Sequence, residues 1–372
     1  MRILLSTPIF EMAGGGAENF AFRLSRALSD RGHEMHVVTD RGSPVPGITV
    51  YHGIAQIEKV REDVRPDLSV DWGFNCRADL HRLGGGAHKY FLDHSLNAYH
   101  GLLRWYKRVR SRSPKHRAII RKQGEMLRRP GAFFLANSSF AADQVVAAGA
   151  RPEVVDVLHN GVDTGMFRPA KGKDEADRLR ARWGLKASDV AVLFVAHNLL
   201  LKNFALLRDI FQTIASRSPR MKLIVVGKRK PSLMPANTVY AGELSDMVTC
   251  YQAADCLAHP TFFDSCANVV LEAMSTGLPV AVSNVCGAHE LVEEGKSGFV
   301  LAVTGKKRVV RDQWLKTLQV LGEDEVLRRR MGAAGREAMV RNDFGVYVTQ
   351  LEGFMKQVLE RKKALGWVGQ PH

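Results

Sequence analysis

The chain has 372 residues, of which 45% are hydrophobic and 24% charged, and its formal net charge is +15 at pH 7. This composition is too apolar for a disordered chain, and the length predicts two domains. No run of about 18 apolar residues occurs, so we expect no membrane-spanning helix. The amino-terminal stretch resembles a buried strand more than a signal peptide. Five scattered cysteines without a C-x-x-C pair argue against a disulfide framework or zinc site, and we expect a cytoplasmic protein.

Strand-like and helix-like runs alternate from the start of the chain. We expect a buried strand at residues 3–5, then three consecutive glycines and a helix whose apolar face contains Phe20, Leu24 and Leu28 at helical spacing. Gly32 ends this helix, and the next strand is expected at residues 33–38. Such alternation predicts parallel βαβ units.

A second series of the same kind follows a stretch rich in lysine and aspartate near residues 171–182. Strands are expected at residues 190–195, 223–227, 256–259 and 279–282, and helices at 204–214, 247–254 and 268–276. The sequence therefore predicts an α/β protein of two Rossmann-like, doubly wound domains that face a cleft. We place the first domain at residues 1–168 and the second at 169–344, with a C-terminal helix at about 345–372 that packs back onto the first domain.

Two carboxylates mark the most informative segment, residues 261–280. Asp264 lies just ahead of the expected helix at 268–276, and Glu272 lies within it. The start of a helix offers unpaired N–H groups to a phosphate, and ionised carboxylates accept hydrogen bonds from the hydroxyls of a ribose or sugar. A surface-loop aspartate and a solvated helix glutamate are the alternative interpretation.

This segment resembles the Glu-x7-Glu motif of the retaining family 4 glycosyltransferases, which have the GT-B fold, and the chain resembles the hexosyltransferases of the lipopolysaccharide core. Other segments resemble motifs of that family in the usual order. They are residues 14–18, 31–34, 136–138, 160–163 and 286–290, and the pair Gly295 and Gly298.

The resemblance implies a role for each residue of the carboxylate motif. Glu272 should accept hydrogen bonds from the ribose of the donor nucleotide. Asp264 takes the place of the first motif glutamate, which contacts the donor hexose, and its side chain is one methylene shorter. The backbone amides of Cys266, Ala267 and Asn268 would hold the donor sugar and diphosphate.

Two further parts of the donor site are implied by the same resemblance. Lys202 matches the family lysine that meets the diphosphate, and His197 stands at the position of the accompanying arginine. A lysine there would stabilise the negative charge that grows on the leaving group. An exposed helix-start lysine and an ordinary loop histidine are the alternatives. Gly15 and Gly16 would approach the donor phosphate or the acceptor.

The first domain contains a second glycine-rich loop at residues 84–86, which His88 follows closely. The loop resembles the acceptor-side turn of the family, whose histidine hydrogen-bonds the donor sugar near the reaction centre. His88 is therefore our catalytic candidate, together with Asp264 and Lys202. A structural histidine is an equal alternative, and Asp93 and His94 are weaker candidates.

The resemblance implies transfer of a hexose, with retention of configuration, from a nucleotide-diphosphate sugar to a cell-envelope glycan or a lipid-linked acceptor such as lipopolysaccharide core. UDP-hexose is the first donor expected. The family needs no metal, and no histidine and carboxylate cluster in the sequence has convincing metal spacing, so we expect no cofactor. A catalytically silent relative that binds glycans or organises a complex is the alternative.

Residues 104–129 concentrate the positive charge of the first half, with eleven lysines and arginines against Glu125. Trp105 and Tyr106 lie among them, a composition that suits an anionic membrane surface. A solvated face or a nucleic-acid site would explain the charge as well. The resemblance favours the membrane, so we expect a peripheral protein at the inner face of the inner membrane, with this patch on the acceptor domain and no nucleic-acid partner.

Overall fold

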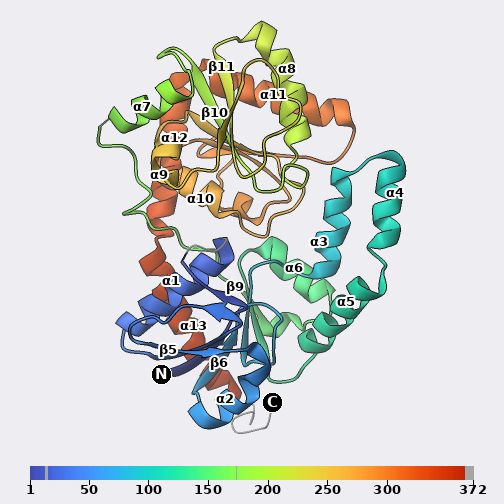
Figure 1. Cartoon of the computed structure of the whole chain (residues 1–372), viewed down its shortest axis with the longest axis vertical. Coiled ribbons are helices and arrows are strands. Elements are labelled where there is room, and N and C mark those ends of the chain that lie inside the picture. The colour runs from blue at the N-terminus through green and yellow to red at the C-terminus, as the bar shows by residue number, and fades with distance from the viewer. Residues whose placement is uncertain (13–15, 173, 365–372) are drawn as a thin grey trace. The chain divides into compact units, whose positions relative to one another are not determined.

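The computed structural model describes residues 1–12, 16–172 and 174–364 (Figure 1). The chain forms two compact units. Unit 1 contains residues 1–91, 111–159 and the chain from Gly345 onward, and unit 2 contains residues 92–110 and 160–344. The expected boundary at 168/169 thus differs from the observed division at 159/160.

Unit 1 is built on a sheet of seven parallel strands in the order β5-β3-β1-β6-β7-β8-β9. Its inner strands are buried on both faces, as a parallel sheet covered by helices requires. Two short strands of the same unit, β2 and β4, pair in parallel and form a separate small sheet. The strands are β1 (Arg2–Ser6), β2 (Ile9–Phe10), β3 (Glu34–Thr39), β4 (Arg41–Gly42), β5 (Ile48–His52), β6 (Leu68–Asp71), β7 (Leu80–Leu83), β8 (Phe133–Ala136) and β9 (Val155–Val157).

The C-terminal helix belongs to unit 1 by its contacts. Tyr347 packs edge-on against Phe20, with ring centroids 5.1 Å apart. Glu352 pairs with Arg31 and His33, and both arginine and histidine come from the turn after the first helix. The helices of this unit are α1 (Gly16–Asp30), α2 (Ile57–Val64), α5 (Pro114–Leu127), α6 (Ser139–Ala147) and α13 (Phe344–Ala364).

Unit 2 has a sheet of six parallel strands in the order β12-β11-β10-β13-β14-β15. Strands β10 and β11 run in full register from one end to the other. The strands are β10 (Val190–Val195), β11 (Met221–Val226), β12 (Thr238–Gly242), β13 (Cys256–His259), β14 (Val280–Ser283) and β15 (Gly298–Leu301).

Alternate residues of β10 enter two different cores. Ala191 and Leu193 pack with residues of α9, α10 and α12, whereas Val192 and Phe194 pack with residues of α8 and α11. Helices therefore cover both faces of this sheet, which Figure 1 shows for α8 and α11 on one side and α9 and α12 on the other. The helices are α4 (Gly101–Arg110), α7 (Asp174–Arg182), α8 (Phe204–Arg217), α9 (Met247–Gln252), α10 (Asn268–Ser275), α11 (Lys307–Glu323) and α12 (Glu325–Arg341).

The predicted fold class of two parallel-sheet α/β domains is confirmed. The placement of the whole basic segment 104–129 on the first domain is wrong, because α4 belongs to unit 2 and α5 to unit 1. Helix α3 (His88–Ser95) starts in unit 1 and ends in unit 2. Within the described residues, no helix is both long enough and apolar enough to cross a membrane.

Candidate active site at the carboxyl ends of the second sheet

The strand order of unit 2 reverses between β10 and β13, because β11 and β12 lie on one side of this pair and β14 and β15 on the other. In open α/β sheets, ligands bind beyond the carboxyl ends of the strands at such a reversal. The loops that leave these ends are residues 196–203 and 260–267. They carry Lys202 and Asp264, so the topology brings together two residues that are 62 positions apart in the chain.

The loop after β10 holds Lys202 at a fixed point just before α8. The backbone N–H of Lys202 donates to the carbonyl of Asn198 at 2.9 Å, and the Asn198 side chain accepts from the N–H of Leu201 at 3.1 Å. Asn203 follows in the left-handed region with φ 59°, which asparagine tolerates better than most residues. The helix then begins at Phe204.

The loop after β13 is tied to the same turn and to the loop after β14. The N–H of Phe262 donates to the carbonyl of Leu201 at 2.9 Å. On the other side, the carbonyl of Asp264 accepts from the N–H of Gly287 at 2.8 Å. Three loop segments therefore fix the backbone of Asp264 and the position of its side chain.

Lys202 and Asp264 form an ion pair between Nζ and Oδ2, with side chains 18% and 21% exposed. The second oxygen of Asp264, Oδ1, accepts from the N–H of Cys266 at 3.3 Å. Burial by itself would raise the pKa of Asp264, but the Lys202 ammonium and the nearby His259 outweigh it and hold the pKa below its usual value. The aspartate is therefore an anion that neutralises Lys202 in this structure.

His259, the last residue of β13, lies beneath this ion pair and is fully buried. Its Nε2 is 3.8 Å from Oδ2 of Asp264, and neither ring nitrogen has a hydrogen-bond partner among the described residues. Burial and the charge of Lys202 lower the pKa of His259, so the imidazole is neutral. Sequence reasoning missed this residue, although a histidine at the end of an apolar strand is an available signal.

Glu272 is held by a residue from another helix. The hydroxyl of Tyr251, in α9, donates to Oε2 of Glu272 at 2.6 Å. Burial raises the pKa of Tyr251 well above its usual value, and the Glu272 charge raises it further, so the phenol stays protonated. Tyr251 was not foreseen, because nothing local in the sequence links it to the carboxylate motif.

The start of α10 is joined to residues 160–163, one of the segments that resemble motifs of the family. The side-chain amide of Asn160 donates to Oδ1 of Asn268 at 2.8 Å, and the carbonyl of Asn160 accepts from the Asn342 amide at 2.7 Å. No side chain caps the helix at Ala267. The backbone at Cys266 lies beside Asp264, to which its N–H donates, and the contact of residues 266–268 with a diphosphate stays a prediction.

The remaining donor-side candidates are less constrained. His197 is exposed in the loop after β10, and its contact with a diphosphate stays a prediction. Gly15 lies outside the described residues, and Gly16 is the first residue of α1.

His88 belongs to unit 1, at the start of α3, whereas the other described catalytic candidates belong to unit 2. Its backbone N–H donates to the Gln123 side chain at 2.9 Å, and its Nε2 is 2.9 Å from Nδ1 of His116. Burial lowers the pKa of His88, and the charge of His116 lowers it further. Sequence reasoning missed His116, which comes from the basic helix α5.

His94, one of the weaker candidates, lies closer to the predicted site than expected. It belongs to unit 2, and its ring centroid is 5.7 Å from that of Phe263, the neighbour of Asp264. Burial lowers the pKa of His94 despite the adjacent Asp93. The structure therefore brings His94 to the loop after β13, while Asp93 is exposed.

A buried polar network occupies the corresponding strand reversal of unit 1, between β1 and β6. Asp71 is fully buried and accepts from Ser6 Oγ at 2.7 Å and from the backbone and side chain of Asn75, each at 3.0 Å. Two further neighbours are His81, whose Nδ1 is 3.2 Å from Oδ2, and Cys76, whose Sγ is 3.7 Å from Oδ1. These bonds fix the loop after β6, where the sequence has Trp72 to Asn75.

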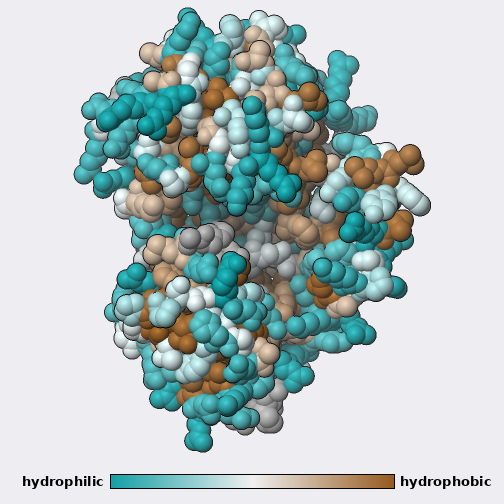
Figure 2. Space-filling view, viewed as in Figure 1, coloured by the Kyte–Doolittle hydropathy of each residue, from teal (hydrophilic) through white to brown (hydrophobic). Residues whose placement is uncertain are grey.

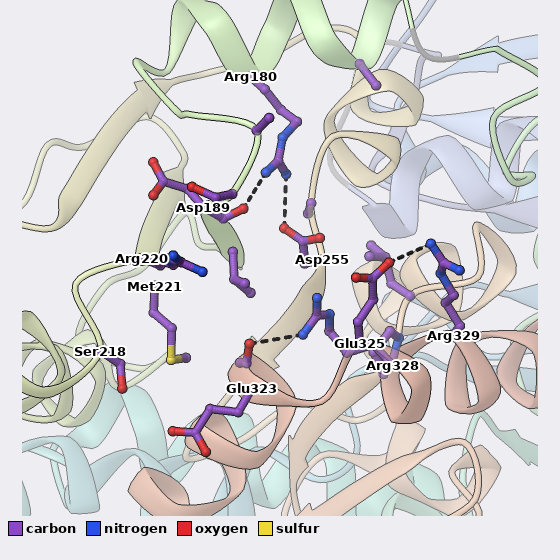
Figure 3. Close-up of a pocket in the computed structure, with 18 of the residues that line it drawn as sticks. Arg180, Asp189, Ser218, Arg220, Met221, Asp255, Glu323, Glu325, Arg328 and Arg329 are labelled. Atoms are coloured by element: carbon purple, nitrogen blue, oxygen red, sulfur yellow. Dashed lines mark hydrogen bonds and ion pairs between the residues drawn. The ribbon is translucent and has the colours of Figure 1, made fainter.

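A cavity of about 1090 Å³ lies at the opposite, amino-terminal ends of the strands of unit 2 (Figure 3). Arg180 reaches Asp255 at 3.0 Å and also donates to the carbonyl of Asp189, which joins the starts of β10 and β13. Arg329 pairs with Glu325 at the rim. The residues that line this cavity include none of the predicted site residues.

A family model matches part of the second half of the chain. It is described as "Glycosyl transferases group 1" and matches residues 189–316, which include Lys202, Asp264 and Glu272. A curated relative from Segniliparus rotundus, named D-inositol 3-phosphate glycosyltransferase, is 27% identical over 86% of this chain and 80% of its own length. A relative of the same name from Corynebacterium efficiens is 29% identical, and the match spans 58% of this chain and about half, 54%, of that relative.

Solved structures resemble the chain over nearly its whole length. WaaG, a glycosyltransferase involved in lipopolysaccharide biosynthesis, has a TM-score of 0.75 at 16% identity and covers 95% of this chain and 99% of its own. HepE from Anabaena, solved with UDP-glucose, has a TM-score of 0.72 at 18% identity and covers 96% of this chain and 100% of its own. At these identities the likeness shows the GT-B fold.

The family model and the curated relatives make this chain similar to glycosyltransferases of group 1. The curated relatives are named for inositol phosphate and not for lipopolysaccharide core.

Proposed function

We propose that this chain is a retaining glycosyltransferase that moves a hexose from a nucleotide-diphosphate sugar, with UDP-hexose as the first donor to test. The observation that carries the proposal is the pairing of Lys202 with Asp264 just before α10. Glu272 lies on α10 and accepts a hydrogen bond from Tyr251 of α9. This arrangement lies within the segment that matches the family model.

Each part of the site suits one part of such a donor. Glu272 would accept hydrogen bonds from the ribose hydroxyls. Lys202 and the N–H groups at the start of α10 would take the diphosphate, whose charge grows as the bond to the sugar breaks. The acceptor hydroxyl would form the new bond on the same face, and its proton would pass to a donor phosphate oxygen. In this proposal Lys202 and the helix N–H groups stabilise the negative charge of the diphosphate, and no metal takes part.

The acceptor is proposed as a phosphorylated cell-envelope glycan or lipid-linked precursor such as lipopolysaccharide core. The names of the curated relatives support a second acceptor, a phosphorylated cyclitol. Both acceptors are anionic polyols. A transfer assay with the two acceptors side by side distinguishes them by the mass of the product.

We further propose that α4 attaches the protein to the inner face of the inner membrane. Its residues Leu102, Trp105, Tyr106 and Val109 follow helical spacing and are exposed, Leu102 by 87% and Trp105 by 65%. Figure 2 shows the apolar side chains over this helix. Arginines and lysines flank the stripe, and each contributes about 1 kcal/mol at an anionic surface.

Sedimentation with vesicles tests the membrane attachment. Vesicles rich in phosphatidylglycerol should bind the protein, and phosphatidylcholine vesicles should bind it much less. Trp105→Ser should weaken binding, whereas Val326→Ser, at an even more exposed apolar residue on α12, should leave it unchanged. Equal binding to both kinds of vesicle, or no effect of Trp105→Ser, would refute the attachment.

Thermal unfolding with UDP, GDP, ADP and CDP, and with their sugar conjugates, tests the donor site. A ligand at about 100 times its Kd adds roughly 2.7 kcal/mol to the unfolding free energy. Glu272→Ala should remove the shift, and Glu337→Ala, an exposed glutamate on α12, should keep it. A shift without sugar transfer to any acceptor would favour the silent relative, and no shift at all would contradict the proposed function.

A further inference from the structure

The ion pair between Lys202 and Asp264 raises a question about ligand binding. Both side chains are largely buried, and the Asp264 carboxylate is already paired with the Lys202 ammonium that the proposed diphosphate would need. A bound diphosphate would draw Lys202 toward its own oxygens. Asp264 would then be a poorly solvated anion beside a second anion, an arrangement that is unfavourable without a new partner.

His259 is the side chain placed to supply that partner. It is fully buried, and both ring nitrogens lack a hydrogen-bond partner among the described residues. Buried polar groups are nearly always hydrogen-bonded, so an exception of this kind needs an explanation. Nε2 is 3.8 Å from Oδ2 of Asp264, a few tenths of an ångström beyond hydrogen-bond distance.

We propose that His259 is a positioning residue that takes a proton from solvent and binds the Asp264 carboxylate when a diphosphate draws Lys202 away. The Nε2–H of the imidazolium would donate to Oδ2, the oxygen that Lys202 leaves. The inference rests on the proposed function, because it takes the diphosphate of a nucleotide sugar as the displacing group. Donor binding is then coupled to the uptake of one proton.

The charged groups around His259 give the sign of this coupling. Lys202, from the loop after β10, lowers the pKa of His259, and Asp264, from the loop before α10, raises it. On the neighbouring strand β14 the register partner of His259 is the apolar Val282. When Lys202 pairs with a diphosphate, Lys202 lowers the pKa of His259 less, whereas Asp264 still raises it. The pKa of His259 rises on binding, so donor affinity falls as pH rises.

Titration calorimetry with UDP-glucose, at several pH values and in two buffers of different ionisation enthalpy, measures this proton uptake. The phosphates of UDP-glucose carry no group that titrates near neutral pH. The wild-type protein should take up close to one proton, and its affinity should fall by at most about tenfold per pH unit. His259→Phe should bind more weakly, without proton uptake and without this pH dependence.

Two further variants keep the inference open to refutation if His259→Phe does not fold. Asp264→Asn should bind UDP-glucose more tightly than wild type and take up no proton, because its Lys202 is no longer shared. His289→Gln, a control histidine whose ring contacts the Cys286 carbonyl at 2.9 Å, should keep the proton uptake. Proton uptake that persists in His259→Phe or in Asp264→Asn would overturn the inference.

The outcomes also separate this inference from the proposed function. Binding of UDP-glucose without proton uptake would overturn the role of His259 and leave the proposed function standing. No thermal shift of the wild-type protein with any of the four nucleotides or their sugar conjugates would overturn both.

Discussion

Replacing Tyr251 with phenylalanine removes one oxygen atom from the proposed nucleotide site. The ring is fully buried in the core that packs on α10, and its hydroxyl donates to Glu272 at 2.6 Å. Phenylalanine keeps the shape of the ring, so the change isolates the hydrogen bond. Glu272 then loses the contact that fixes the direction of its carboxylate toward a ribose.

The size of the effect follows from the partners. A hydrogen bond to a charged group contributes about 1.5–3 kcal/mol, and the partial exposure of Glu272 lets water replace it in part, which favours the lower end of the range. We therefore expect about a tenfold rise in Kd for the nucleotide. If the same free energy is lost from folding, Tm should fall by about 3–6 °C.

Calorimetric binding of UDP to Tyr251→Phe and thermal unfolding of the unliganded variant measure the two effects. Tyr51→Phe removes a hydroxyl that lies 3.2 Å from His36 in unit 1, and it should leave nucleotide affinity unchanged. Unchanged affinity in Tyr251→Phe would show that this phenol does not orient Glu272. A loss as large as that of Glu272→Ala would show that more than one hydrogen bond was removed.

Three predictions concern stability. Gly332→Ala should lower the free energy of unfolding in denaturant by about 3 kcal/mol, because its Cβ would lie 1.9 Å from a backbone carbonyl oxygen. Gly335→Ala, whose Cβ would have contacts of 3.6 Å or more, should raise that free energy by about 0.5–1 kcal/mol. Lys362→Ala should cost about 3–5 kcal/mol by removing the ammonium that pairs with the buried Asp79 carboxylate, and Lys363→Ala, at an exposed neighbour, less than about 0.5 kcal/mol. Although burial raises the pKa of Glu352, hydrogen bonds from a histidine and an arginine outweigh it and lower the pKa below 4.5. The ionised Glu352 therefore adds to the free energy of unfolding above that value, and this contribution is lost as pH falls through the lowered pKa. Glu352→Gln should remove this part of the acid dependence of unfolding.

Local patterns in the sequence predicted the fold class correctly and supplied candidate site residues. Alternating apolar runs predicted the strands around residues 3–5 and 190–195, because burial on both faces of a parallel sheet requires them. Lys202, Asp264 and Glu272 were identified from their motif, and the structure places all three in unit 2, with Lys202 and Asp264 paired. Each of these signals lies within a few consecutive residues.

Local patterns did not predict the contacts between segments that are distant in the sequence. Tyr251 meets Glu272 from another helix, and His116 meets His88 across 28 positions of the chain. The strand order that brings the loops after β10 and β13 together also depends on which strands pair, and no local period encodes that choice. The segment 92–110 is assigned to unit 2 by contacts of the same kind.

The sequence by itself therefore determined which elements form and which residue types line the ends of the strands, because periodicity and spacing act within one element. Only the tertiary structure decided the partners of the charged groups. Asp264 was expected to face a sugar, and the fold places it against Lys202 and above the buried His259. The protonation and pairing of a buried group depend on every element packed around it, which a linear motif does not contain.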